Sequence, residues 1–189
     1  MKIDRAAIVE AAFAVLGEAG LDGLSLRLVA ERLGVQAPAL YWHVHNKAEL
    51  IGLMAATVSA AALQEEPEGP GWGARLVGFG RALRRAMLQH RDFARLCVIA
   101  QPLEDPEVTA SRQAAPLIAA GLDRRRALSF QASVIAYTLG WVVYEQNPTM
   151  HEHLAHIIDF NESFDAGLLA MVHGFTATAV VEAEILGPA

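Results

Sequence analysis

The chain has 189 residues, of which 53% are hydrophobic and 19% charged, and its formal net charge is −6. These values exclude a largely disordered chain and suit one compact domain or two small ones. A single cysteine, Cys97, excludes an internal disulfide. The N-terminus lacks the layout of a signal peptide, so we expect a cytoplasmic protein. The negative charge argues against non-specific coating of nucleic acid or anionic membranes, although a local basic patch is compatible with it.

Residues 127–144 form an uncharged stretch directly after three arginines. A bilayer-spanning helix needs about 20 mostly apolar residues. This stretch is shorter and contains four polar residues, among them Gln131 and Thr138. We therefore expect no membrane span.

Alanine and leucine dominate segments of helical length, and strand-like alternation is rare, so we predict an all-α fold. Residues typical of helix starts and ends divide the chain. The expected helices cover residues 4–19, 25–33, 39–43 with Pro38 in the first turn, 47–64, 72–89, 93–100, 106–120, 124–146 and 164–186. Residues 147–163 are expected to form a loop with a short helix.

The clearest break is the acidic segment EEPEGPG at residues 65–71. It separates a predicted N-terminal helix-turn-helix domain at residues 1–46 and a connecting helix at 47–64 from a second domain at 72–189. The second domain is predicted to bind a small molecule and to dimerise.

The second and third helices are joined only by Gly34, Val35 and Gln36. Such a short turn makes two helices cross steeply, so the third can enter a DNA major groove while the second braces it. Ala30 is small enough for close packing, and Val35 and Leu40 are expected to fill the space between the helices. This spacing indicates DNA binding.

The stretch LSLRLVAERLGVQAPALYWHVHNKAEL, residues 24–50, resembles the DNA-binding signature of the TetR family of bacterial transcriptional repressors. The resemblance implies a homodimer that binds a palindromic double-stranded operator and leaves it when a small effector binds. It implies backbone contacts from Ser25, Tyr41, Trp42 and Lys47, and base or groove contacts from Arg27, Ala37, Pro38, Ala39 and His43.

Residues 1–50 hold five Lys or Arg and six Asp or Glu. The positive surface that DNA requires must therefore come from placement, and we expect Arg27, His43, His45 and Lys47 on one side. The alternative is a helical adaptor that kept the motif but binds a protein.

Beyond Trp72, the segments GWGARLVGFGRALRRAMLQHRDFARL and YTLGWVVYEQ resemble the ligand domain of the tetracycline-repressor branch. Its ligand-binding residues are not kept, because Cys97, Phe79, Tyr144 and Ala61 occupy positions of hydrogen-bonding or metal-binding groups. The resemblance therefore implies a more apolar effector than magnesium-tetracycline, and no cofactor.

Two helices carry stripes of small residues that favour close helix packing. These stripes predict a four-helix dimer seam, although both faces could instead be used within one monomer. They comprise Ser129, Ser133, Ala136 and Gly140 in one helix, and Gly167, Ala170, Gly174, Ala177 and Val181 in the other.

An aromatic stripe beside the small residues predicts one wall of an effector pocket, with core packing as the alternative. Glu145 and Gln146 would be nearby polar anchors. The predicted effector-binding residues are Phe79, Leu83, Met87, Cys97, Gln101, Phe130, Tyr137, Trp141 and Tyr144.

Two further clusters of polar residues stand out, one of arginines and one of histidines with an aspartate. Arg81, Arg84 and Arg85 are expected on the outer face of their helix, opposite its apolar side. His151, His153, His156 and Asp159 have spacings that fit a metal site if the segment is helical. A small metal-dependent enzyme using these four residues is the alternative to a regulator, although no nucleophile motif or phosphate-binding loop accompanies them. We therefore predict a transcription regulator that is not an enzyme and binds no metal.

Overall fold

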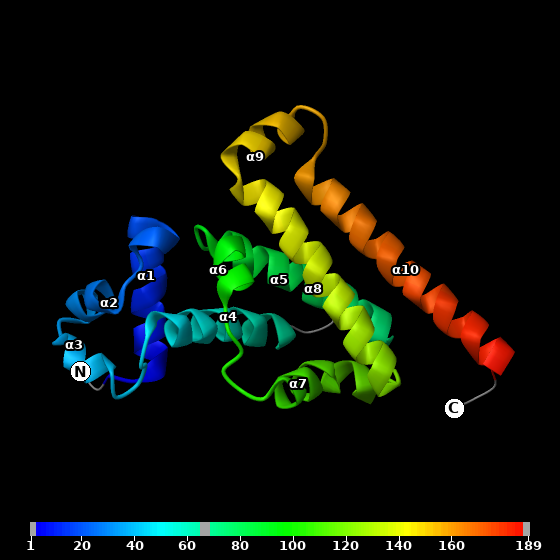
Figure 1. The fold of residues 1–189 in the computed structure, drawn as a ribbon. Helices are drawn as coiled ribbons and strands as arrows, with labels where there is room; N and C mark the ends of the chain where they lie inside the picture. The colour runs from blue at the N-terminus through cyan, green and yellow to red at the C-terminus, as the bar shows by residue number, and fades with distance from the viewer. Residues whose placement is uncertain (1–2, 65–68, 187–189) are drawn as a thin grey trace. The chain divides into compact units, whose positions relative to one another are not determined.

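The computed structural model describes residues 3–64 and 69–186, with side chains to residue 178. These ranges contain helices and no strand, which confirms the all-α fold (Figure 1). The helices are α1 (Arg5–Gly23), α2 (Leu26–Leu33), α3 (Ala37–Leu40), α4 (Lys47–Leu63), α5 (Gly71–Leu88), α6 (Phe93–Ile99), α7 (Pro106–Ala119), α8 (Arg124–Gln146), α9 (Pro148–Ala155) and α10 (Phe160–Leu186).

The last part of the chain differs from the prediction. Helix α10 begins at Phe160, four residues earlier than expected, because the side chain of Asp159 accepts a hydrogen bond from the Glu162 amide at 2.8 Å. Asn147 caps α9 in the same way, through the amide of Met150 at 3.1 Å. Both are ordinary N-terminal caps that the polar composition of this segment concealed.

The chain forms two compact units. The first contains residues 1–61 and 85–106, and the second contains residues 62–84 and 107–189. Residues 85–106 thus belong to the same compact unit as the N-terminal helices. The sequence prediction assigned them to the effector-binding domain at residues 72–189. That division stays a prediction.

Within the first unit, α1 bends at Gly20, whose φ of 69° and ψ of 177° lie in a region that is essentially open to glycine alone. The bend frees the amide of Leu21, which donates to Asp92 Oδ2 at 3.1 Å. The carbonyl of Leu21 accepts from Lys47 Nζ at 3.0 Å. One glycine therefore fixes where α1 meets α4 and the residues before α6.

Replacing Gly20 by alanine should lower the free energy of unfolding by about 1–3 kcal/mol, because the backbone must keep a strained conformation. The added Cβ would also lie 3.1 Å from Asp92 Oδ2. Urea denaturation followed by circular dichroism measures the change. Gly17→Ala is the matched control, since Gly17 is helical and its Cβ meets nothing within 4 Å. Equal stabilities of the two variants would contradict this role for Gly20.

The second unit is organised around α8 and α10, which run antiparallel (Figure 1). Phe130 stacks on Phe175 with ring centroids 4.1 Å apart, and Tyr137 donates to the carbonyl of Phe164 at 2.8 Å. A Cβ on Gly167 would lie only 2.2 Å from the Tyr137 hydroxyl oxygen. Gly167 is thus required for packing within the chain, whereas the prediction placed it in a dimer seam.

Helix α8 is long and apolar enough to cross a membrane by length and composition, and it is the one such helix in the described ranges. In the fold, one stripe of it is buried against other helices of the second unit. That stripe consists of Ala127, Gln131, Val134, Thr138 and Val142. Length and composition alone are weak evidence for a membrane span, because helices of globular cores pass the same test.

The prediction that Arg81 and Arg84 lie on the outside is wrong. Arg81 forms two hydrogen bonds with the carboxylate of Asp165, at 2.8 and 2.5 Å. Arg84 forms two with Glu145, each 2.7 Å, and its guanidinium lies 4.8 Å from the centre of the Phe164 ring. Long arginine stems reach around a helix, so spacing alone misplaced these charges.

Candidate DNA interface and effector pocket

Local turn chemistry builds the helix-turn-helix. Ser25 caps α2 by accepting a hydrogen bond from the Leu28 amide at 3.3 Å, and Gly34 ends the helix in the left-handed conformation. Pro38 lies in the first turn of α3, where its missing N–H costs nothing. Ala30 and Leu40 are both buried, as predicted for the contact between the two helices. Sequence therefore dictates this geometry almost residue by residue.

The end of α3 presents two large aromatic side chains to solvent. Trp42 is 88% exposed and Tyr41 is 50% exposed. Adjacent exposed aromatics on a small helical unit mark an interaction surface. Pro38 is exposed beside them, and Ala37, Ala39 and His43 are half-buried. The predicted contact residues of α3 and the turn after it thus form one surface.

The cations near this surface already have partners. Arg27 is exposed and pairs with Glu31 at 2.5 Å, and Arg5 lies 3.4 Å from Glu49. The backbone amide and ring of His45 donate to Glu49, which holds the pKa of that carboxyl below its usual range. Of the predicted backbone contacts, Lys47 differs most, because its ammonium group is half-buried against the Leu21 carbonyl. Contacting a DNA base or groove through Arg27 would require it to give up its ion pair with Glu31.

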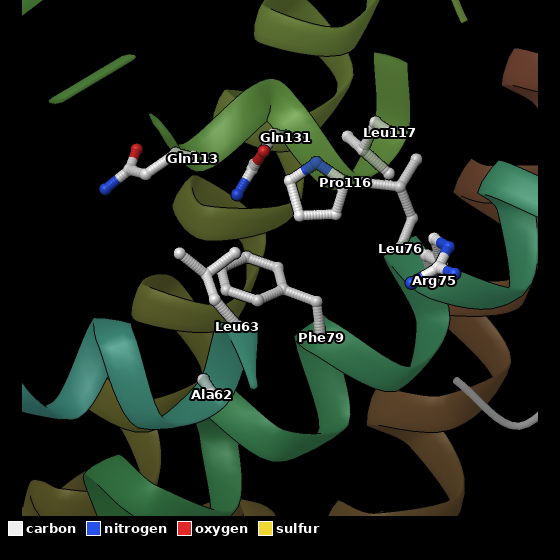
Figure 2. A pocket seen from close by; sticks show the side chains of 9 residues that line it. All are labelled: Ala62, Leu63, Arg75, Leu76, Phe79, Gln113, Pro116, Leu117 and Gln131. Carbon is white, nitrogen blue, oxygen red and sulfur yellow. The ribbon is translucent and has the colours of Figure 1, made fainter. Parts of the chain in front are cut away.

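A pocket in the second unit lies between the end of α4, α5, α7 and α8 (Figure 2). Its buried wall is apolar and includes Leu76, Phe79 and Leu117. Two amides, Gln113 and Gln131, and the exposed Arg75 add polar groups. Apolar walls with few polar groups are typical of small-molecule sites. The full lining is Ala62, Leu63, Arg75, Leu76, Phe79, Gln113, Pro116, Leu117 and Gln131.

Of the predicted effector-binding residues, the structure places Phe79 on this lining. The aromatic stripe of α8 instead contacts α10: Trp141, for example, meets Phe160 and Phe164 edge-on at 6.2 and 6.3 Å. Tyr144 is 46% exposed. Leu83 is buried in the second unit, whereas Met87, Cys97 and Gln101 belong to the first.

Sequence reasoning missed Gln131 as a pocket residue. The sequence signal was present, because glutamine is rare on a fully buried stripe of an otherwise apolar helix. In the sequence, its polarity served only to disfavour a membrane span. Gln113 and Arg75 carried no distinguishing pattern in the sequence.

Cys97 is half-buried, and burial raises the pKa of its thiol from 9.0 to about 11. At pH 8 the folded protein should hold about a hundredfold less thiolate than the unfolded chain, since the raised pKa keeps the proton bound. We therefore expect iodoacetamide to alkylate the native protein about a hundredfold more slowly than the protein unfolded in about 8 M urea. Mass spectrometry follows the reaction at this single cysteine. Equal rates would show that the thiol is freely ionised in the fold.

The four residues of the metal-site alternative do not come together. The ring of His151 stacks on Phe160 at 4.8 Å, His156 ends α9, and Asp159 caps α10. Across residues 3–64 and 69–186, no three His, Cys, Asp or Glu side chains form a group that could hold a metal ion. The enzyme alternative has no support.

Comparison with known proteins decides the family. Residues 8–54 match the model of the bacterial regulatory proteins of the tetR family, and residues 65–157 match that of the tetracyclin repressor-like C-terminal domain. The chain is 32% identical to tetracycline repressor protein class A from transposon 1721 of Escherichia coli, over 99% of this chain and 97% of the relative. The chain belongs to the TetR family.

Solved structures of TetR-family proteins share the fold. A variant of TetR from Acinetobacter baumannii AYE in complex with minocycline has a TM-score of 0.74 and 33% identity, covering 94% of this chain and 98% of that one. Streptomyces coelicolor ActR in complex with actinorhodin has a TM-score of 0.74 and 26% identity, covering 93% and 96%. The protein is a ligand-responsive, DNA-binding transcription regulator of the TetR family.

Proposed function

We propose that this TetR-family protein is a cytoplasmic homodimeric repressor that leaves a palindromic operator when a small, largely apolar effector binds. The observation that carries the proposal is the exposed Tyr41 and Trp42 pair at the end of the recognition helix α3. Ser25, Tyr41, Trp42 and Lys47 are proposed to contact the DNA backbone. Arg27, Ala37, Pro38, Ala39 and His43 are proposed to contact bases or grooves. We propose no catalytic role.

The small-residue faces of α8 and α10 support the dimer. Ala136, Gly140, Ala170 and Gly174 are exposed, and a Cβ on either glycine would meet nothing within 4 Å. A second copy could therefore approach these faces closely, giving a seam of two helices from each subunit. Val181, the last residue of the predicted stripe, lies outside the described side chains.

The pocket at Phe79 is the proposed effector site, and α4 is the proposed connection to the DNA. Ala62 and Leu63 at the end of α4 line the pocket, while Lys47 at its start bonds to Leu21 of α1. A ligand that binds one position of α4 better than another shifts the spacing of two recognition helices, which must match successive major grooves about 34 Å apart. The replacement of a hydrogen-bonding group by Phe79, which lines this pocket, favours an apolar ligand. The other predicted effector residues stay proposals for a ligand-bound form.

DNase I footprinting of the DNA flanking the protein's own gene tests this proposal. We expect protection of two inverted half-sites separated by about one helical turn. Light scattering of the free protein should give the mass of two chains. A monomer, or protection without inverted symmetry, would contradict the proposed dimeric mode of binding.

A further inference from the structure

The side-chain amide of Gln131 is an unusual polar group in the described core. The residue is only 4% exposed, and its Oε1 has no hydrogen-bond partner among the described residues. A buried acceptor without a partner costs free energy, so native folds rarely keep one without a use for it. Thr138, two turns further along α8, is the second such case.

Gln131 differs from Thr138 because it faces a pocket. It lines the same space as the rings of Phe79 and Pro116, and Figure 2 shows its amide beside the Pro116 ring. The cavity there has a volume of about 30 Å³. On the same scale, one water molecule needs about 10–15 Å³. That cavity volume holds the hydroxyl or N–H end of a ligand, whose remaining atoms would occupy the part of the pocket that is open to solvent.

We propose that Gln131 determines effector specificity by accepting, at Oε1, a hydrogen bond from a hydroxyl or N–H group on an otherwise apolar ligand. This inference rests on the proposed function of the pocket. The ligand's carbon skeleton contacts Phe79, Leu76 and Leu117, which are all buried and apolar. Arg75 is exposed at the pocket and remains in contact with water. The chemistry recognised is that of a phenol or a related aromatic donor.

Pairs of probes that differ only in the donor test the proposal. Phenol is compared with anisole, and 2-naphthol with 2-methoxynaphthalene, by isothermal titration of the full-length protein. We expect the hydroxyl compound of a pair to bind at least about fivefold more tightly, because the ether leaves the buried acceptor unpaired. In Gln131→Leu this preference should vanish.

Thr138→Val is the matched control. It removes the other unpaired buried oxygen of α8 but lies outside the pocket lining, so the preference should persist. Both variants should keep or raise the thermal midpoint, by about 2–4 °C, because each removes an unsatisfied polar group. Their folding therefore does not limit the test.

Equal affinity for both members of each pair would overturn the proposal and indicate that water satisfies Gln131. Absence of binding by all four probes would also overturn it, as would loss of the preference in Thr138→Val. Isothermal titration measures ligand binding in the absence of DNA. Its result is therefore independent of whether the protein is a repressor. Failure of the proposed repressor function would instead appear as absence of sequence-selective DNA binding by the same protein preparation.

Discussion

Replacement of Glu145 by glutamine is expected to lower the free energy of unfolding by about 3–5 kcal/mol, because it leaves a buried arginine without its counter-charge. The side chains of Arg84 and Glu145 are only 12% and 9% exposed. Their two 2.7 Å hydrogen bonds join α5 to α8, and Arg84 also donates to Asn161 Oδ1 of α10 at 2.9 Å. One guanidinium thus connects three helices of the second unit.

Chemical denaturation of the variant measures this loss. The matched control is Glu107→Gln, because Glu107 pairs with Arg124 at an exposed position, where the side chains are 71% and 50% exposed. Exposed ion pairs contribute about 0–1 kcal/mol, so the control should unfold almost as the wild type does. Similar losses in both variants would contradict a special role for the buried pair.

Replacement of Trp42 by alanine is expected to weaken DNA binding about tenfold or more, as loss of one protein–DNA contact typically costs about 1–3 kcal/mol. The loss should be similar on operator and random DNA if Trp42 contacts the backbone. Folding should be unaffected, because a side chain that is 88% exposed leaves no cavity when removed. Fluorescence anisotropy with labelled duplexes measures the affinities.

Two comparison variants sharpen that experiment. Ile157→Ala removes an apolar side chain that is 65% exposed but lies in the second unit, so DNA affinity should not change. Lys47→Ala is a weaker probe, because Lys47 also bonds to the Leu21 carbonyl and its loss affects the fold. Unchanged DNA binding by Trp42→Ala would remove this residue from the proposed interface.

The DNA-binding motif was predictable because short-range chemistry determines it. Ser25, Gly34 and Pro38 each fix a helix end through their own backbone or side chain, with no need for distant contacts. The positions of the long helices were also predictable, because local residues mark most of their ends. The start of α10 was missed, because Asp159 was assigned to a metal cluster rather than to a helix cap.

The pocket was less predictable, because periodicity shows which residues share a helix face but not what covers that face. Helix α8 carries aromatic, small and polar stripes, and its aromatic stripe packs on α10. The stripe that contains Gln131 faces the pocket and core. The placement of Arg84 failed similarly, since its partner Glu145 lies 61 residues away along the chain. Long-range pairings of this kind require the fold.

We expect this TetR-family protein to bind a specific DNA sequence. Fluorescence anisotropy of the purified protein, with the DNA flanking its own gene and with a scrambled duplex, tests it most directly at two salt concentrations. We expect tight, sequence-selective binding by two chains or a multiple of two per site, with affinity falling as salt rises. Equal, weak binding to both duplexes would contradict the claim and favour a helical adaptor that binds another protein.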